Sequence, residues 1–339
     1  MKKHLFKIRE DGKYGFINAD GEVVIEPQYY EAEDFYNGFS RVRFNNRLVP
    51  MDELGRLLMK HFFNYVGFFE EGLARAQLVR QWGYIDQRGS LQIPIGFAQA
   101  GDFSEGVAAV EYAGLFGYIT STADFQVIPQ FEAASEFKHG MAAVAMQGEW
   151  GYINSKGECL FTTDFDQCYA FQGRVAPVRK DQKWGLIDAW GNICIAPEFD
   201  LPEGGTQIDF FDGMAIVLQD EQYGFINEAG VLAIPPQYDF VGDFGEGLAL
   251  IEVDGKFGYI NKENQKVIAP QFDDAGVFSD GLAQVQVRGK WGFINTDGAW
   301  IIPPKYEQVL PFQEGLTLAV SDEKWIYLNR FEDVIWREN

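Results

Sequence analysis

The stretch Lys290-Trp291-Gly292-Phe293-Ile294-Asn295 decides the fold, because its pattern recurs along the whole chain at a constant spacing. The repeated word contains an aromatic residue, a glycine, a second aromatic residue, Ile, and Asn or Asp. Its glycine stands at positions 15, 83, 117, 151, 185, 224, 258 and 292. Neighbouring positions are 34 residues apart, or twice that between 15 and 83, apart from one spacing of 39. Such a period predicts a tandem array of repeats rather than separate domains.

Two degenerate copies complete the series. Val49 and Ile326 stand where the spacing places a glycine, so the sequence contains ten units. The spacing of 39 lies between positions 185 and 224, and we assign its five additional residues to a loop insertion near 201–205. We therefore expect residues 1–339 to form a single repeat array.

Each unit is predicted to contain three short strands, as unit 9 shows most clearly. Its strands are expected over residues 281–287, 291–295 and 299–302. Arg288-Gly289-Lys290 is a tight hairpin signal between the first two strands. The glycine of Asn295-Thr296-Asp297-Gly298 suits a positive φ between the last two. These signals predict three-stranded antiparallel units.

A connector of about twelve residues follows each third strand and ends in Phe-x-x-Gly in eight of the nine cases, Phe171 being the exception. Alternate side chains of a strand face opposite ways, and the central strand is apolar on both faces. One unit cannot bury such a strand, so neighbouring units are expected to cover it. The connector phenylalanines are predicted to form a column in the core, made of Phe35, Phe69, Phe103, Phe137, Phe171, Phe210, Phe244, Phe278 and Phe312.

The array can be open or closed. The chain starts in a first strand and finishes after a third strand, so no strand is left over to join the ends. A β-propeller blade usually has four strands in about 40–45 residues, and propellers have up to about eight blades. We therefore expect an all-β open β-solenoid or superhelix, with a closed β-propeller-like ring as the alternative.

The charge of the chain excludes several classes of partner. Fifty acidic and 28 basic side chains give a formal net charge of −22, which repels phosphate backbones and anionic lipids. Nucleic acid is not expected as a partner, and no apolar run is long enough for membrane insertion. If Met1 is the native start, the chain is expected in the cytoplasm; if a signal was removed, the sequence does not indicate a location.

Catalytic motifs are missing from the sequence, so we expect no enzyme activity, no cofactor and no metal site. The three histidines, His4, His61 and His139, lie in different repeats. No phosphate-binding, nucleophile-elbow or zinc-binding word occurs. A remote alternative is an enzyme whose site is assembled across repeats.

Acidic residues recur immediately before the connector glycine, which makes them the first candidate site. If the units stack in register, these carboxylates form a ladder that could bind cations or a basic peptide. The alternative interpretation is a row of solvated turn residues. The six residues are Glu71, Glu105, Asp212, Glu246, Asp280 and Glu314.

Exposed aromatic residues are the second candidate. Trp190 replaces a usually polar turn residue in Asp188-Ala189-Trp190-Gly191, so we expect it on the surface as an anchor for a partner or a sugar ring. Unit 2 contains an apolar excess that includes Phe62 and Phe63. This excess predicts either a binding surface or local repacking of the core.

The repeated words resemble the WG (KWG) repeat family of bacterial proteins, with Lys290-Trp291-Gly292-Phe293-Ile294-Asn295 as the clearest copy. They are more distantly similar to the aromatic-rich hairpin repeats of cell-wall-binding proteins. The resemblance implies a bacterial origin and an interaction role, and it transfers no catalytic residue. We expect a non-catalytic scaffold for another protein. The alternative is carbohydrate or cell-wall binding, which needs partly exposed central-strand aromatics in grooves between units.

Overall fold

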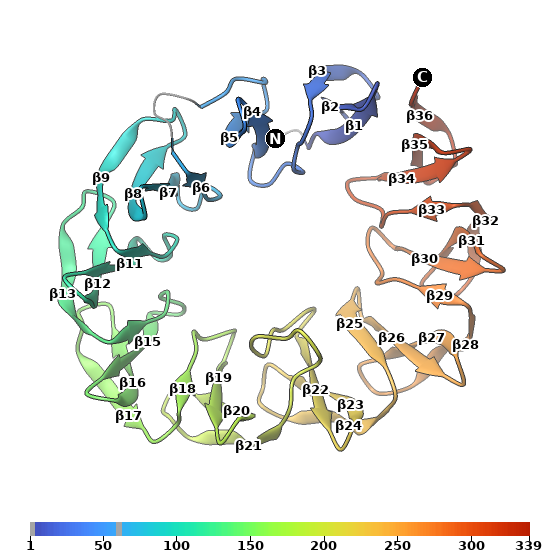
Figure 1. Cartoon of the computed structure of the whole chain (residues 1–339). Helices are drawn as coiled ribbons and strands as arrows, with labels where there is room; N and C mark the ends of the chain where they lie inside the picture. Colours follow the sequence, from blue (N-terminus) through green and yellow to red (C-terminus); the bar gives the residue numbers. More distant parts are fainter. Residues whose placement is uncertain (1–3, 59–62) are drawn as a thin grey trace.

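The computed structural model describes residues 4–58 and 63–339, and these residues form strands and no helix. The strands make ten small antiparallel sheets that follow one another in chain order. Each sheet comes from one repeat, so the prediction of an all-β tandem array is confirmed. Figure 1 shows the sheets placed around a central opening. The described residues include no helix that could cross a membrane.

Nine units have three strands that lie side by side in chain order, and the described part of unit 2 has the first two. The first strands are β1 (Phe6–Glu10), β4 (Phe39–Phe44), β7 (Leu73–Leu78), β11 (Val107–Tyr112), β15 (Met141–Met146), β19 (Val175–Lys180), β22 (Met214–Gln219), β26 (Leu248–Val253), β30 (Leu282–Val287) and β34 (Leu316–Ser321). The central strands are β2 (Lys13–Ile17), β5 (Arg47–Asp52), β8 (Gln81–Asp86), β12 (Leu115–Thr120), β16 (Glu149–Asn154), β20 (Lys183–Asp188), β23 (Gln222–Asn227), β27 (Lys256–Asn261), β31 (Lys290–Asn295) and β35 (Lys324–Asn329).

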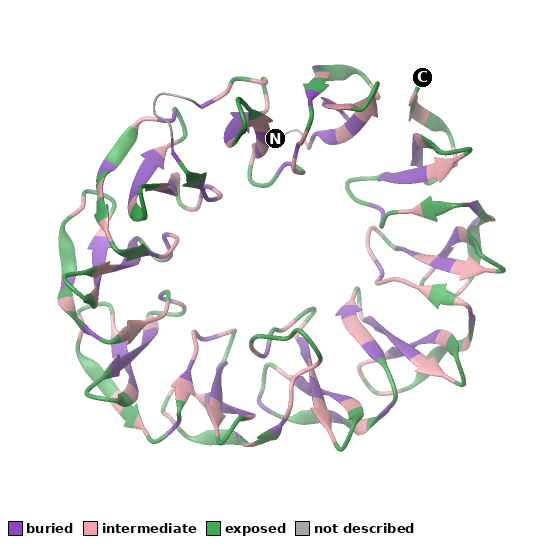
Figure 2. Cartoon of the chain, in the orientation of Figure 1, coloured by how far each residue is buried: buried purple, intermediate pink, exposed green. Residues whose placement is uncertain are grey.

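The third strands lie along the outer rim (Figure 1). They are β3 (Val23–Tyr29), β9 (Leu91–Phe97), β13 (Phe125–Phe131), β17 (Cys159–Thr163), β21 (Ile193–Phe199), β24 (Leu232–Tyr238), β28 (Lys266–Phe272), β32 (Trp300–Tyr306) and β36 (Val334–Arg337). Figure 2 shows buried residues along the central strands and exposed residues along the rim.

A fourth, short strand corrects the prediction of three-stranded units. It comes from the connector and pairs with the first strand of the following unit, at the sheet edge opposite the third strand. We call it the edge strand. The edge strands are β6 (Tyr65–Val66), β10 (Gln99–Ala100), β14 (Ala133–Ala134), β18 (Gln167–Cys168), β25 (Val241–Gly245), β29 (Asp274–Ala275) and β33 (Gln308–Val309). Among the described residues, the sheets that begin with β1, β4 and β22 have none.

The third strand explains the glycine of the repeated word. Pairing between β8 and β9 shifts register at this point, and the β9 backbone comes very close to β8. A Cβ atom on Gly83 would lie 2.5 Å from the Ile93 carbonyl oxygen. A side chain there would therefore displace the third strand. Unit 2, which has Val49 instead, shows no third strand in its described part, and Ile326 of unit 10 pairs directly with Arg337.

The second aromatic residue of the word forms the core between consecutive units. Tyr118 has no exposed surface, and its ring meets the ring of Phe137 edge-on at 4.7 Å between centroids. The Tyr118 hydroxyl donates a hydrogen bond to the Ser135 carbonyl oxygen. The same ring contact recurs in the pairs Phe16–Phe35, Tyr84–Phe103, Tyr152–Phe171, Phe225–Phe244, Tyr259–Phe278 and Phe293–Phe312. Neighbouring units therefore bury each other's central strands.

The predicted phenylalanine column has one exception, next to the loop insertion. Residues 201–205 lie outside the strands, between β21 and β22, as expected for a loop. Phe210, which follows this loop, is only half-buried, whereas Ile208 is 1% exposed and belongs to the core. The word of the preceding unit carries Leu186 instead of the second aromatic ring. The longer connector therefore packs differently at this junction.

The first and last units contact each other, and we call this junction the seam. Tyr327 donates a hydrogen bond to the Lys7 carbonyl oxygen at 2.8 Å. Arg9 donates to both carboxylate oxygens of Glu338, at 2.9 and 3.1 Å. Phe6 shares a buried cluster with Tyr327. These contacts connect unit 1 to unit 10.

Candidate functional site

Trp190 lies in the turn between β20 and β21 and is 78% exposed. The Asp188 carboxylate accepts a hydrogen bond from the Trp190 amide at 2.9 Å, and Gly191 has a φ of 83°. The turn is therefore held in a fixed conformation that directs the indole into solvent. The surface position expected for Trp190 is observed, and its role in binding stays a prediction.

Two other units carry a large apolar residue at the same turn position. Leu54 of unit 2 is 71% exposed and Phe331 of unit 10 is 79% exposed. The sequence analysis missed both residues. The signal was present in the alignment of the units, because the other turns place polar or small residues there, namely Asp20, Arg88, Thr122, Lys156, Ala229, Glu263 and Asp297.

Apolar residues of the preceding unit lie beside these turns. Trp300, Ile301 and Phe331 line a pocket of about 580 Å³ between units 9 and 10. At the equivalent place between units 5 and 6, Leu160, Trp190 and Ile193 are all exposed. Gly191 of this turn is in contact with the ring of Phe161, which follows Leu160. We call the exposed apolar surface at each of the three turns, around Leu54, Trp190 and Phe331, an outer groove; a pocket is observed at Phe331.

Five of the six predicted ladder carboxylates bind the backbone of the next unit. Glu105 accepts a hydrogen bond from the Gly140 amide at 2.9 Å. Both residues are in the left-handed region, with φ values of 54° and 75°. The other pairs are Glu71–Gly106 at 2.9 Å, Asp212–Gly247 at 2.6 Å, Glu246–Gly281 at 2.9 Å and Asp280–Gly315 at 2.8 Å. The carboxylates therefore link consecutive units, a role that the sequence analysis did not consider.

The ladder is discontinuous. His139 and Gly173 occupy its position in units 4 and 5, and Glu314 has no glycine partner among the described residues. Burial would raise the pKa of Asp212, but hydrogen bonds from Lys262 and the Gly247 amide outweigh this effect and lower it. No group of three potential metal ligands occurs in the described part of the chain.

The apolar excess of unit 2 divides into two parts. Phe62 lies outside the described residues, and so does His61. Phe63 is 8% exposed and packs with Leu58 and Val66. A buried side chain cannot present a binding surface, so Phe63 belongs to the core, in agreement with the repacking alternative.

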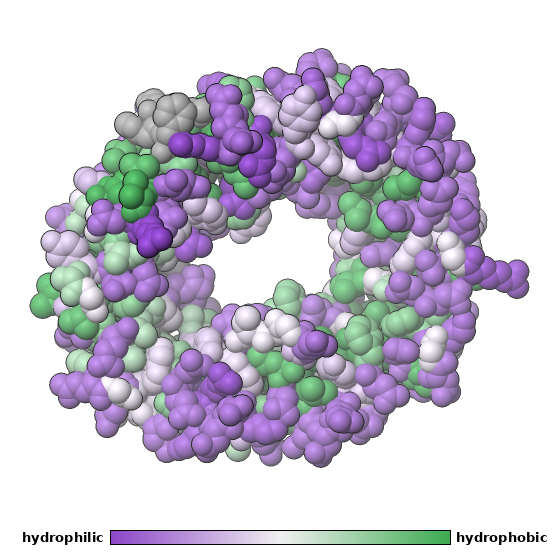
Figure 3. All heavy atoms as spheres, in the orientation of Figure 1, coloured by the Kyte–Doolittle hydropathy of each residue, from purple (hydrophilic) through white to green (hydrophobic). Residues whose placement is uncertain are grey.

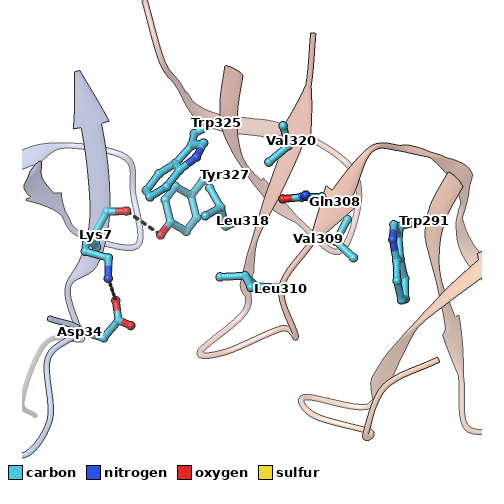
Figure 4. A pocket seen from close by; sticks show the side chains of 10 residues that line it. All are labelled: Lys7, Asp34, Trp291, Gln308, Val309, Leu310, Leu318, Val320, Trp325 and Tyr327. Atoms are coloured by element: carbon cyan, nitrogen blue, oxygen red, sulfur yellow. Dashed lines mark hydrogen bonds and ion pairs between the residues drawn. The ribbon is translucent and has the colours of Figure 1, made fainter. Parts of the chain in front are cut away.

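The two aromatic residues of the word differ in exposure. The second is buried, whereas Trp150, Trp291 and Trp325 are half-buried. Trp150 and Tyr169 line a pocket of about 460 Å³ between units, and Trp291 and Trp325 line one of about 510 Å³. Figure 4 shows the second pocket, with both indoles at its walls. The sequence analysis expected neighbouring units to cover the central strand; the second aromatic is covered in this way, and these three tryptophans are covered only in part.

A family model for the WG containing repeat matches the chain over residues 14–47, 82–116, 150–184, 184–223, 223–257, 257–291 and 291–325. Val49 of unit 2 and Ile326 of unit 10, which replace the word glycine, lie outside these ranges, and so does Gly117 of unit 4, which has it. No curated protein matches the chain in sequence.

Several solved structures are similar to this chain. The crystal structure of the eukaryotic initiation factor has a TM-score of 0.55 and 11% identity, and the match covers 100% of this chain and 96% of that one. Dihydro-heme d1 dehydrogenase NirN in complex with DHE has a TM-score of 0.42 and 11% identity, covering 100% and 73%. Hsv2p of Kluyveromyces lactis has a TM-score of 0.34 and 11% identity, covering 69% and 94%. The structural neighbours include β-propellers.

The likeness to these structures concerns the fold alone, since so few residues are identical. The repeat model, in contrast, matches the sequence itself over more than half of the chain. The matched ranges begin at the aromatic residue of the word, as in Tyr14, Trp82 and Trp291, so the model and the strands share one register. The chain therefore belongs to the family of proteins that contain WG repeats.

Proposed function

We propose that this protein is a non-catalytic scaffold that binds another protein at its outer grooves. The observation that carries the proposal is the exposure of Leu54, Trp190 and Phe331 at one turn position in three units. Large side chains surrounded by polar surface are typical anchors of protein interfaces. Because the three turns lie on separate units, a partner with several contact points would be held across the array.

We also propose that the array is a closed, propeller-like ring, because the contacts of Lys7, Arg9 and Phe6 connect unit 1 to unit 10. The space-filling view shows an opening surrounded by atoms, which fits such a ring (Figure 3). Closure is tested by a disulfide between cysteines placed at Arg9 and Glu338. A second pair at Ala134 and Val144, which are Cα partners across the junction between units 4 and 5, is the control for an internal junction. Oxidation of the control pair alone would favour an open array.

Binding at the outer grooves is tested with a photoreactive aromatic amino acid introduced at Trp190 or at Phe331. In cells that produce the protein, both positions should give the same cross-linked partner. Ala229 is the matched control, because it is exposed at the same turn position of unit 7 and has no large side chain. Equal cross-linking from Ala229, or none from Trp190 and Phe331, would refute the proposal.

Carbohydrate or cell-wall binding is the second candidate. It is favoured by Trp150, Trp291 and Trp325, which are half-buried in pockets between units. Sugar rings stack on partly exposed aromatic faces that are flanked by polar groups. A glycan and peptidoglycan binding panel tests this candidate. If the protein is retained on a glycan or on peptidoglycan, and Trp291→Ala abolishes this retention while Trp190→Ala does not, the glycan site lies between the units. If the wild-type protein is not retained, carbohydrate binding is refuted.

A further inference from the structure

The seam lacks one strand that the junction between units 4 and 5 contains. There, the edge strand β14 pairs with β15, and the Ser135 amide donates a hydrogen bond to the Ala143 carbonyl oxygen at 2.9 Å. The residue of β1 equivalent to Ala143 is Lys7, eight positions before the word glycine in each case. Among the described residues, no edge strand pairs with β1. In the part of the chain that the structure describes, this edge of the first sheet therefore has no partner strand, and unit 10 lies directly against it.

Tyr327 shows the consequence of the missing strand. In the junction between units 4 and 5, the Tyr118 hydroxyl donates to the carbonyl of Ser135, the residue whose amide binds β15. In the seam, the Tyr327 hydroxyl donates directly to the Lys7 carbonyl on β1. The hydroxyl has thus replaced the backbone amide that the connector supplies elsewhere.

A pocket lies beside this hydrogen bond. It has a volume of about 510 Å³, and its lining includes Leu310, Leu318, Val320 and Trp325 of unit 10. Figure 4 shows these side chains on one wall and Lys7, held by Asp34 at 3.2 Å, on the other. A second pocket of about 350 Å³ extends the first, because both are lined by Lys7, Asp34, Leu310, Leu318 and Tyr327. The two pockets form one elongated groove along the seam.

Phe6 fills a different part of the seam. Its ring contacts Tyr327 edge-on at 5.5 Å, as Phe137 contacts Tyr118 at 4.7 Å. Phe6 is 5% exposed, so this part of the core is complete. The seam therefore has a substitute for the connector phenylalanine and none for the edge strand.

We propose that the seam groove binds an extended peptide segment of a partner protein, which adds to β1 as its missing edge strand. The edge strands at the other junctions define the chemistry of this segment. A backbone amide of the peptide is expected to donate a hydrogen bond to the Lys7 carbonyl oxygen in place of the Tyr327 hydroxyl. The Tyr327 hydroxyl then donates to a carbonyl oxygen of the peptide, so no hydrogen bond is lost. A small apolar side chain faces Ile8, as Ala134 faces Val144.

The occupant is a peptide because the recognition described here uses backbone groups in strand geometry. Admitting it requires the seam to widen by about the 4.8 Å that separates neighbouring strands. The proposal uses Leu310 and β1, and none of the residues of the outer grooves, so it is independent of the scaffold proposal.

The probe is a fluorescent peptide with the sequence of residues 131–139, which contains β14. Its anisotropy is measured against the full chain. We expect saturable binding that weakens at least about tenfold when the peptide residue equivalent to Ser135 is proline, because proline has no amide to donate. In the protein, Leu310→Glu should weaken binding by a similar factor. Leu115→Glu is the matched control, since both leucines are exposed and Leu115 lies on β12 of an internal unit.

Three outcomes would overturn the proposal. The first is the lack of saturable binding to the wild-type chain. The second is equal binding of the proline peptide, which would show that no strand is added. The third is unchanged affinity in Leu310→Glu, which would place the peptide elsewhere, for example in an internal junction after displacement of its own edge strand. Circular dichroism confirms that both leucine variants keep their strands.

Discussion

The junction between units 4 and 5 and the seam make the same aromatic contact in two ways. In the internal junction the ring that meets Tyr118 is Phe137, which comes from the connector. In the seam the ring that meets Tyr327 is Phe6, which comes from the first strand itself. At the position of Phe6 the other nine units have small buried residues, namely Ser40, Ala74, Ala108, Ala142, Ala176, Ala215, Ala249, Ala283 and Thr317.

This difference shows that the contact, rather than the residue position, is what the fold requires. A connector supplies its own phenylalanine, so the residue of the first strand that lies beside this phenylalanine must be small. Where the connector is missing, a large side chain on the first strand fills the space. The seam also relies on Arg9 and Glu338, whereas internal junctions are held by the covalent connector.

The largest expected effect tests the internal contact. Phe137→Ala should lower the free energy of unfolding by about 3–5 kcal/mol, because it leaves a cavity beside Tyr118. Urea denaturation followed by tryptophan fluorescence measures the loss. Phe125→Ala is the control, since Phe125 is 38% exposed at the rim and its removal leaves no enclosed cavity. Equal losses in the two variants would show that the phenylalanine column does not carry the core.

The second prediction exchanges the two arrangements. Phe6→Ala gives unit 1 the alanine that most internal units have at this position, but without a connector phenylalanine beside it. The free energy of unfolding should fall by roughly 2–4 kcal/mol, less than for Phe137→Ala, because the site adjoins an open groove. Ala142→Phe puts the seam residue beside an existing Phe137 and should cost about 1–3 kcal/mol through overpacking. The same denaturation experiment measures both. If Ala142→Phe leaves the free energy of unfolding unchanged, the internal position has space for a second ring. The proposed difference between the internal junction and the seam would then be wrong.

The units and their strands could be predicted because the turns and the apolar alternation act locally. The close approach of the third strand at Gly83 was not predicted, because the sequence analysis used the word glycine only to find the period. The edge strands could not be predicted, since two paired residues such as Gln99–Ala100 show no periodicity. Phe6 could have been found by aligning the ten units, because a phenylalanine in a column of small residues needs a local explanation.

The candidate site was predicted in part for the same reason. The exposure of Trp190 followed from its turn, where no neighbour can cover the side chain. Burial of Phe63 depended on packing between units, which a single sequence does not show. The hydrogen bond that the Gly140 amide donates to Glu105 joins residues 35 apart, one more than the period, so the spacing shows that equivalent pairs recur but not that they bond.

The third prediction concerns pH and the ion pair of the seam. Burial would raise the pKa of Glu338, but hydrogen bonds from Arg9 and the Trp325 amide outweigh it and hold the pKa below its ordinary value of 4.5. The ionised carboxylate therefore stabilises the seam fully above pH 4.5, and this contribution is lost as the pH falls through the lowered pKa. Energy transfer between dyes on units 1 and 10 should report separation of the ends in acid.

Two controls separate this effect from general acid unfolding. Dyes placed across the junction between units 4 and 5 should keep their distance at a pH where the seam has opened, because a connector holds that junction. Glu338→Gln should already show the longer seam distance at neutral pH. Simultaneous separation at both junctions would mean that Glu338 has no specific role.

The smallest expected effect compares two members of the acidic ladder. Glu105→Ala removes the acceptor of the Gly140 amide and should lower the free energy of unfolding by about 0.5–1.5 kcal/mol, because the bond is charge-assisted but exposed. Glu314→Ala is the matched control: Glu314 has the same left-handed turn and no glycine partner among the described residues. Both substitutions place alanine at a positive φ, so the backbone cost is common to them and cancels. If the two variants lose equal stability, the carboxylates are only solvated turn residues; if Glu105→Ala alone is destabilised, the ladder links unit to unit.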